Sequence, residues 1–171
     1  MASPPSPPRN FFPVSDCTWA ELSPTAPGFI NTTPVKRGRK WQGIKYERKA
    51  QDLFAQRYGE QYARSQWIRF KADGSERIRW CQPDGLLFVP QRNALVVVEF
   101  KYQHTEMAWW QMFYLYIPVV SRLFAEQRFS IRGCEVVRWY DPDVRTSQKP
   151  TLCAKVEDVM PGQFGVHIFN P

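Results

Sequence analysis

Acidic side chains and one lysine occupy positions where an ordinary domain carries apolar or freely exposed residues. Glu99 ends the most hydrophobic stretch of the chain, Val96-Val97-Val98, and Lys101 follows two residues later. Asp84 comes directly after Gln82-Pro83, fifteen residues before Glu99. Clustered carboxylates repel one another, so such a group is unstable unless a cation lies among them. Oxygen ligands without paired histidine or cysteine favour Mg²⁺, with Mn²⁺ as a substitute.

The chemistry that this group could perform is hydrolysis of a phosphodiester bond. A metal ion held by Asp84 and Glu99 would offset negative charge on a phosphodiester oxygen. Lys101 could orient a water molecule beside the metal and help to deprotonate it. These are the groups that cutting a nucleic-acid backbone requires.

Two predicted strands must position these side chains. Residues 94–101 are β-branched and apolar on both faces, which is typical of a central strand covered on both sides. Side chains alternate along a strand, so Glu99 and Lys101 share one face. Residues 77–89 predict the preceding strand. If the two strands pair, the carboxylates of Asp84 and Glu99 converge at one edge of the sheet.

A further acid lies on a predicted helix over residues 43–58. Glu47 belongs to the buried stripe of this helix, with Gly43, Ala50 and Phe54 at near-helical spacing. Its basic neighbours point outward. The alternative is structural, because a helical glutamate among basic residues often only forms an ion pair one turn away.

The remaining pattern supplies the other elements. Residues 66–71 predict a short strand, and Asp73-Gly74 predicts a hairpin turn. Thr105 is the expected N-cap of a long aromatic helix over residues 105–124, which Pro118 should kink. Residues 134–140 predict another strand. The expected order is helix, three strands, helix, strand.

Asp84 in Gln82-Pro83-Asp84, followed by Glu99-Phe100-Lys101, resembles the PD-(D/E)XK nuclease superfamily, whose core order is αβββαβ. The resemblance covers residues 43–140. It implies an α/β fold with a restriction-endonuclease-like core, a central mixed sheet flanked by helices. It also implies that Asp84, Glu99 and the main-chain carbonyl of Phe100 bind the metal, and that Lys101 is the catalytic lysine.

Two further positions match the superfamily. Glu47 corresponds to its upstream helical acid, which supports a second metal or contacts the metal through water. Gln111 is similar to the glutamine of the RecB-like branch and is a candidate supporting residue. That branch has the pattern Q-x-x-x-Y, whereas Tyr114 here comes one residue too early.

Structural alternatives stand beside these roles. Lys101 could be a solvated lysine at a strand end, and Asp84 could be a turn or bulge residue. Gln111 and the aromatic residues near it suit a core or a subunit interface. His104 has no evident partner and is assigned no role.

The net charge of the 171-residue chain is +7, and its excess lies in one segment. Residues 36–80 hold thirteen basic and five acidic side chains, whereas the remainder holds ten and eleven. A solubilising face is the alternative to a surface that follows phosphates. The candidate nucleic-acid-binding residues are Lys36, Arg37, Arg39, Lys40, Lys45, Arg48, Lys49, Arg69, Arg77 and Arg79.

Composition limits the other possibilities. The four cysteines are far apart and only two histidines are present, which argues against a zinc or iron–sulfur site and favours reduced thiols in the cytoplasm. No apolar stretch reaches the roughly 20 residues that a bilayer requires. Residues 1–40 are expected to form a proline-rich arm or partly disordered leader, and residues 41–171 a single nuclease-like domain. The arm and the 105–124 helix are candidate contacts for a homo-oligomer.

The sequence therefore predicts a Mg²⁺-dependent deoxyribonuclease, of the kind that serves recombination, repair or genome processing in phages and mobile elements. A non-catalytic nucleic-acid-binding or assembly protein that keeps the nuclease fold is the first alternative. An RNase on the same scaffold is the second, because nothing in the sequence distinguishes the sugar.

Overall fold

The computed structural model describes residues 6–30, 34–143 and 148–171, so parts of the predicted arm, 1–5 and 31–33, lie outside the described residues. The helices are α1 (Gly38–Tyr58), α2 (Glu106–Gln111) and α3 (Ile117–Leu123), and a π-helical turn (Met112–Tyr116) joins the last two. The strands are β1 (Cys17–Ser23), β2 (Tyr62–Arg64), β3 (Trp67–Ala72), β4 (Arg79–Cys81), β5 (Gly85–Val89), β6 (Ala94–Gln103), β7 (Ser130–Trp139), β8 (Thr151–Leu152) and β9 (Phe164–Ile168).

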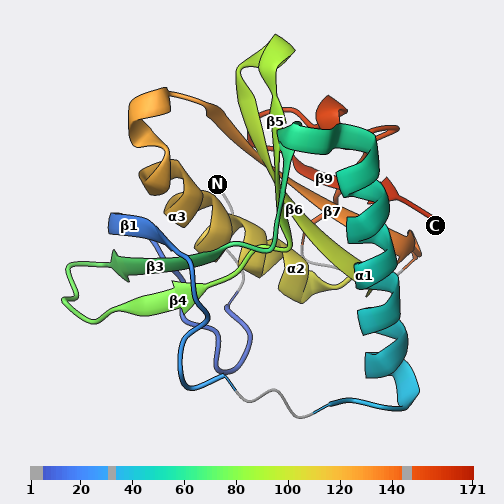
Figure 1. Ribbon diagram of the computed structural model, residues 1–171, viewed down its shortest axis with the longest axis horizontal. Coiled ribbons are helices and arrows are strands. Elements are labelled where there is room, and N and C mark those ends of the chain that lie inside the picture. Colours follow the sequence, from blue (N-terminus) through green and yellow to red (C-terminus); the bar gives the residue numbers. More distant parts are fainter. Residues whose placement is uncertain (1–5, 31–33, 144–147) are drawn as a thin grey trace.

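The fold is α/β, as predicted, and is built on a mixed six-stranded central sheet (Figure 1). The strand order is β2-β5-β6-β7-β9-β8. The pairs β2/β5 and β5/β6 are antiparallel, whereas β6/β7, β7/β9 and β8/β9 are parallel. Strand β6 is fully buried from Ala94 to Phe100, which confirms the prediction of a central strand covered on both faces.

Helices cover the two faces of this sheet. On one face, Phe54 of α1 packs in a cluster with Val96 and Val98 of β6. On the other face, Val97 of β6 packs in a cluster with Val120 of α3. The alternation of β6 side chains therefore divides the core into two layers. Residues 95, 97, 99 and 101 point toward the α2–α3 side.

Residues 77–89 do not form one strand, and this prediction was wrong. The segment divides at Gln82-Pro83-Asp84 into β4 and β5, which belong to different sheets. Proline cannot donate a ladder hydrogen bond, so pairing stops there. Strands β3 and β4 form a separate three-stranded sheet with β1, and the short strand β2 takes the first place in the central sheet.

The Asp73-Gly74 turn was predicted correctly. Both residues have positive φ, 54° and 69°, and the Ser75 N–H closes the turn on the Ala72 carbonyl at 2.9 Å. The whole connection between β3 and β4 runs over residues 73–78. The Asp73 carboxylate also accepts hydrogen bonds from the main-chain N–H groups of Ser15 and Asp16, 3.1 and 3.0 Å long. The proline-rich arm is therefore in part tied to the hairpin, and β1 within it pairs with β3. Helix α1 begins at Gly38, five residues before the predicted start.

The long aromatic helix is kinked one turn before Pro118, as predicted, at Tyr114, whose φ and ψ of −114° and 15° are not helical. Thr105 occupies the N-cap position without a side-chain capping hydrogen bond, and the π-helical turn interrupts the helix before Pro118. Proline has no N–H, so the carbonyl of Tyr114, four residues earlier, lacks its helical donor. The main-chain N–H of Val14 donates to this carbonyl at 2.7 Å. The arm thus satisfies a carbonyl that proline leaves free.

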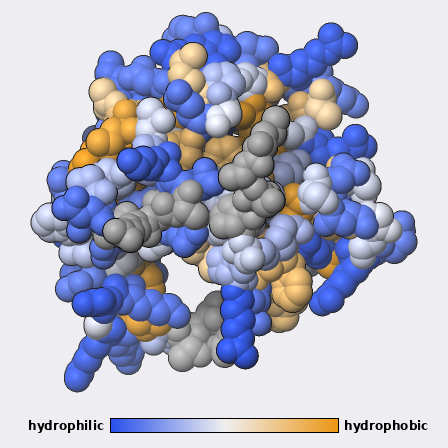
Figure 2. Space-filling model, turned by 180° about the vertical axis from the view of Figure 1, so that it is seen from behind, coloured by the Kyte–Doolittle hydropathy of each residue, from blue (hydrophilic) through white to orange (hydrophobic). Residues whose placement is uncertain are grey.

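The aromatic side chains of this helix contribute to the chain's own core, where Trp110 and Tyr116 are buried. Figure 2 shows a face that is mostly hydrophilic, with apolar residues in small separate patches. Homo-oligomerisation through this helix or through the arm stays a prediction. Among the described residues, no helix has the length and apolar character needed to cross a membrane.

We expect a Gly85→Ala substitution to lower the free energy of unfolding by about 1–3 kcal/mol, because a methyl group there would overlap the ring of Tyr62. Urea denaturation measures the change. Gly43→Ala is the matched control. Within the described residues, nothing beyond its chain neighbours and its own helix backbone lies within 4 Å of the added methyl group, and alanine in a helix should raise stability by about 0.5–1 kcal/mol. Equal effects of the two substitutions would contradict this packing account.

Candidate metal and nucleic-acid site

The candidate site lies where β5 and β6 separate. Their antiparallel ladder ends at the Gly85–Val98 pair. Beyond it, the main-chain N–H of Phe100 donates to Oδ2 of Asp84 at 2.7 Å. The N–H and carbonyl of one strand residue point toward the same neighbouring strand, so the Phe100 carbonyl also faces the Asp84 side. The structure therefore brings the predicted ligand Asp84 to the same place as the predicted carbonyl of Phe100.

Glu99 and Lys101 lie on the same face of β6, as predicted. Lys101 Nζ is 2.5 Å from Oε1 of Glu99. The Glu99 side chain is only 3% exposed, whereas that of Lys101 is 30% exposed. The second oxygen of Glu99, Oε2, is buried and has no hydrogen-bond partner among the described residues. A buried carboxylate oxygen without a partner is costly unless a cation or a proton satisfies it.

Glu47 reaches this group through a polar network that starts on α1. Gln51, one turn after Glu47, donates from Nε2 to Glu47 Oε1 and to Ser65 Oγ, each at 3.2 Å. The Ser65 main-chain N–H donates to the Asp84 carbonyl at 2.9 Å. Glu47 is half-buried, and its basic neighbours Lys45, Arg48 and Lys49 are exposed, as the helical spacing predicted.

The electrostatics of the site reflect buried carboxylates close to one another. Burial, followed by the charges of Glu99 and Glu47, raises the pKa of the Asp84 carboxyl to about 9. Burial also raises the pKa of Glu99, although Lys101 opposes the shift. Burial and the charge of Glu99 raise the pKa of Glu47. Burial lowers the pKa of Lys101, but the charge of Glu99 and its hydrogen bond outweigh this effect, and the pKa is raised.

Sequence reasoning assigned His104 no partner, and this was wrong. His104 Nδ1 is in close contact with Oε2 of Glu135, and both side chains are buried. Glu135 is paired with Glu99 in the β6/β7 ladder. Burial raises the pKa of Glu135, and the hydrogen bond with His104 opposes the shift. A buried histidine–carboxylate pair therefore lies directly beside the candidate site.

The π-helical turn changes which tyrosine lies near the acids. A π-helical turn contains one residue more than an α-helical turn. Tyr116, five positions after Gln111, therefore lies on the same helix face as Gln111, where a regular α-helix would place the residue four positions after it. Burial and the charges of Glu99 and Asp84 raise the pKa of the Tyr116 hydroxyl. Gln111 Oε1 is buried without a hydrogen-bond partner in the described part of the chain. No sequence signal marks the extra residue, so the sequence showed only that Tyr114 comes one residue too early for the Q-x-x-x-Y pattern.

The predicted basic residues fall into two groups. All seven on or just before α1 are exposed, and within the described ranges none forms an ion pair: Lys36, Arg37, Arg39, Lys40, Lys45, Arg48 and Lys49. On the small sheet, Arg69 pairs with Glu21, and Arg79 donates to the Phe12 carbonyl at 2.7 Å. Arg77 is exposed. The helix therefore carries most of the available positive charge.

Three residues of the site were missed. Gln51 and Ser65 form the network, and Ser65 carries no signal because it lies between elements. Glu135 did carry a sequence signal, since it interrupts an apolar strand segment just as Glu99 does. An acid inside a buried strand is the same anomaly at both positions.

The residues present fit a hard divalent cation. Asp84 and Glu99 supply two carboxylates, Phe100 supplies a carbonyl, and one carboxylate oxygen lacks a partner. The described residues contain no group of three or more histidine, cysteine or acidic side chains arranged around one metal position. Mg²⁺ commonly binds through one or two carboxylates and completes its coordination with water and substrate phosphates. The donor set is therefore compatible with Mg²⁺ or Mn²⁺.

No protein-family model matches the chain, and neither the curated proteins nor the solved structures gave a match.

We expect Asp84→Asn to stabilise the metal-free chain at pH 8, by on the order of 1 kcal/mol, and to have little effect at pH 5. The raised pKa means that the native state retains a proton that the unfolded state releases between about pH 4 and 9. Stability is therefore lost as the pH rises through this window, and the neutral amide removes that loss. Thermal unfolding in EDTA measures it.

Glu76→Gln is the control for this experiment. Glu76 is an exposed acid whose pKa is lowered by its hydrogen bond with Lys71, so its neutral variant should give no stabilisation that grows with pH. An Asp84→Asn effect of the same sign and size at both pH values would contradict the assigned electrostatics.

Proposed function

We propose that this chain is a metal-dependent nuclease that hydrolyses phosphodiester bonds in DNA and uses Mg²⁺, with Mn²⁺ as a substitute. The observation that carries the proposal is the meeting of Asp84, Glu99 and Lys101 where β5 and β6 separate, with Glu99 Oε2 left without a partner. An ordinary structural site would not bury carboxylates together with a single lysine.

Each residue has a role in this proposal. Asp84, Glu99 and the Phe100 carbonyl would hold the cation, which when bound supplies positive charge against the phosphodiester oxygens. Lys101 is partly exposed beside Glu99 and would hold the attacking water by a hydrogen bond. Glu47 would contribute through water or a second cation, because the Gln51–Ser65 network fixes its carboxylate.

The arrangement of the central sheet supports assignment to the PD-(D/E)XK superfamily. Helix α1 is followed by the antiparallel strands β2, β5 and β6, then by α2–α3, and then by β7 parallel to β6. This is the order αβββαβ, with β3 and β4 inserted between its first two strands. The placement of Gln111 and Tyr116 on one helix face supports the RecB-like branch.

The charge of α1 supports a nucleic-acid substrate. Cations crowd its N-terminus, where the helix dipole disfavours positive charge, and the first turn has no acidic residue. A phosphate bound there would relieve this repulsion. DNA and RNA carry the same phosphates, so matched DNA and RNA substrates decide between a deoxyribonuclease and an RNase.

We expect Glu99→Gln and Lys101→Met each to reduce cleavage by at least about 100-fold, because they remove a cation ligand and the water-holding group. Cleavage of labelled single-stranded, duplex and branched DNA in Mg²⁺ or Mn²⁺ measures this loss. The substrate affinity of Glu99→Gln in EDTA should change little.

Lys71→Met is the matched control. Lys71 also pairs with a glutamate, Glu76, but on the exposed hairpin, so its loss should leave cleavage nearly unchanged. Absence of cleavage by the parent chain on DNA and RNA in both metals would overturn the proposal. Salt-sensitive binding without cleavage would instead indicate the non-catalytic alternative.

A further inference from the structure

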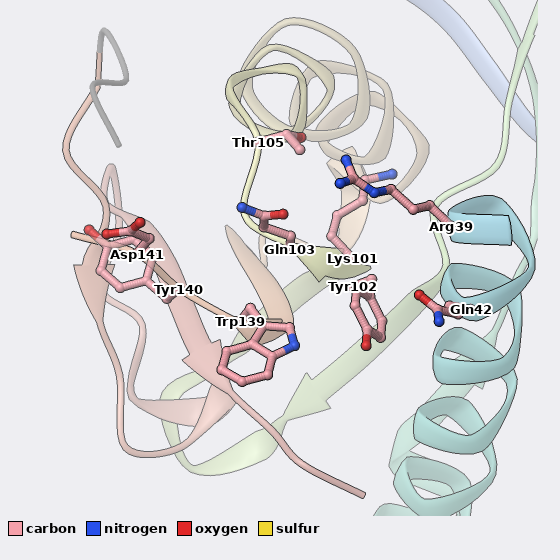
Figure 3. Close-up of a pocket in the computed structure, with 9 residues that line it drawn as sticks. All are labelled: Arg39, Gln42, Lys101, Tyr102, Gln103, Thr105, Trp139, Tyr140 and Asp141. Atoms are coloured by element: carbon pink, nitrogen blue, oxygen red, sulfur yellow. The ribbon is translucent and has the colours of Figure 1, made fainter. Parts of the chain in front are cut away.

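A groove adjoins the candidate site between the start of α1 and the C-terminal ends of β6 and β7. It consists of two neighbouring cavities of about 650 and 380 Å³ that share Gln42 and Tyr102. The larger cavity is also lined by Lys101, which belongs to the candidate site. Figure 3 shows Arg39 extending from α1 toward Lys101, with Trp139 and Tyr140 on the opposite wall. The groove therefore leads directly to the acidic cluster.

The walls of the groove are strongly basic. Its positively charged lining residues are Arg39, Lys45, Lys49, Lys101 and Arg138. Asp141 is the acidic residue that lines it among the described residues. Lys45 and Lys49, four residues apart on α1, follow the smaller cavity along the helix. A row of cations of this kind follows a chain of phosphates.

The groove also presents aromatic side chains. Trp139, at the end of β7, is 59% exposed, although burial of an indole ring is favourable. Its main chain is fixed, because its carbonyl accepts a hydrogen bond from His104 N–H at 3.1 Å. The Tyr102 ring is held by Tyr46, with ring centres 6.1 Å apart, and by the Arg138 guanidinium, 5.4 Å from its centre. The Tyr102 ring is therefore held in place, and the Trp139 ring is largely exposed on a fixed main chain.

We propose, on the basis of the proposed function, that this groove binds an unpaired nucleic-acid strand, with a base stacked on Trp139 and the backbone along α1. Every base has a flat face that stacks on an aromatic ring, and single-strand-binding grooves combine such rings with cations. In a duplex those faces are covered by neighbouring base pairs. Exposed rings beside cations therefore favour a single strand, which the groove would guide to Lys101.

The test is binding of fluorescein-labelled oligothymidine and of a blunt hairpin duplex to the full chain in EDTA, measured by fluorescence anisotropy. Oligothymidine should bind more tightly than the duplex. Trp139→Ala should weaken oligothymidine binding about tenfold, within the range for loss of one stacked base, and should leave duplex binding unchanged. Trp139→Phe keeps an aromatic face and should retain most of the affinity.

Phe12→Ala is the matched control, because Phe12 is 72% exposed but lies outside the groove and should not affect binding. Equal oligothymidine affinity of Trp139→Ala and the parent, or tighter binding of the duplex, would overturn the inference. If the parent chain cleaves DNA but Trp139→Ala does not change binding, the nuclease proposal holds and the groove inference is wrong. If Trp139→Ala weakens binding but the parent chain cleaves no substrate, the groove inference holds and the nuclease proposal is wrong.

Salt dependence tests the cationic wall separately. For a single strand, each phosphate contact contributes about −0.7 to the slope of log K against log salt concentration. Lys45→Ala and Lys49→Ala should each make this slope shallower by about that amount. The control Lys155→Ala, which removes a lysine outside the groove, should not change it. Unchanged slopes for both groove variants would exclude α1 from the path of the strand.

Discussion

The candidate site depends on one hydrogen bond, from the main-chain N–H of Phe100 to the carboxylate of Asp84. It gives this N–H an acceptor beyond the end of the β5/β6 ladder, which stops at the Gly85–Val98 pair. Tyr62 packs against Gly85 in the space that a side chain there would fill, and its hydroxyl donates to the Asp84 carbonyl at 3.4 Å. Main-chain pairing of β5 with β6 thus begins at Gly85, the residue after Asp84, and the Asp84 carboxylate lies at the end of this ladder, where β6 carries Glu99.

This arrangement places three carboxylates in the core, but only two of them have a basic side chain as a partner among the described residues. Lys101 pairs with Glu99, and His104 pairs with Glu135, but Asp84 is held mainly by a backbone N–H. The raised pKa of Asp84 shows that the metal-free site favours a protonated carboxyl. Local rules of burial are broken most often where function requires it. A divalent cation would remove this conflict, because it interacts with the ionised carboxylates that burial disfavours.

The sequence predicted those parts of the site that depend on local periodicity. Alternation along β6 placed Glu99 and Lys101 on one face, and helical spacing placed Glu47 inward. Prediction failed where long-range pairing decides the structure. The residues on either side of Pro83 have similar patterns, yet they join different sheets. The partnership of His104 with Glu135 crosses two elements, and the π-helical turn beside Tyr116 arises from a proline and a contact with the arm.

The end of β6 also relates the groove to the acidic cluster. Lys101 and Tyr102 are consecutive residues of one strand, so their side chains point to opposite faces, yet both line the larger cavity. The cavity therefore passes around the strand end, from the α2–α3 side to the α1 side. A nucleic-acid strand bound along this cavity must bend sharply over a few nucleotides. Duplex DNA is stiff over about 150 base pairs, whereas an unpaired strand can follow such a path. The position of the site at a strand end thus favours the flexible substrate.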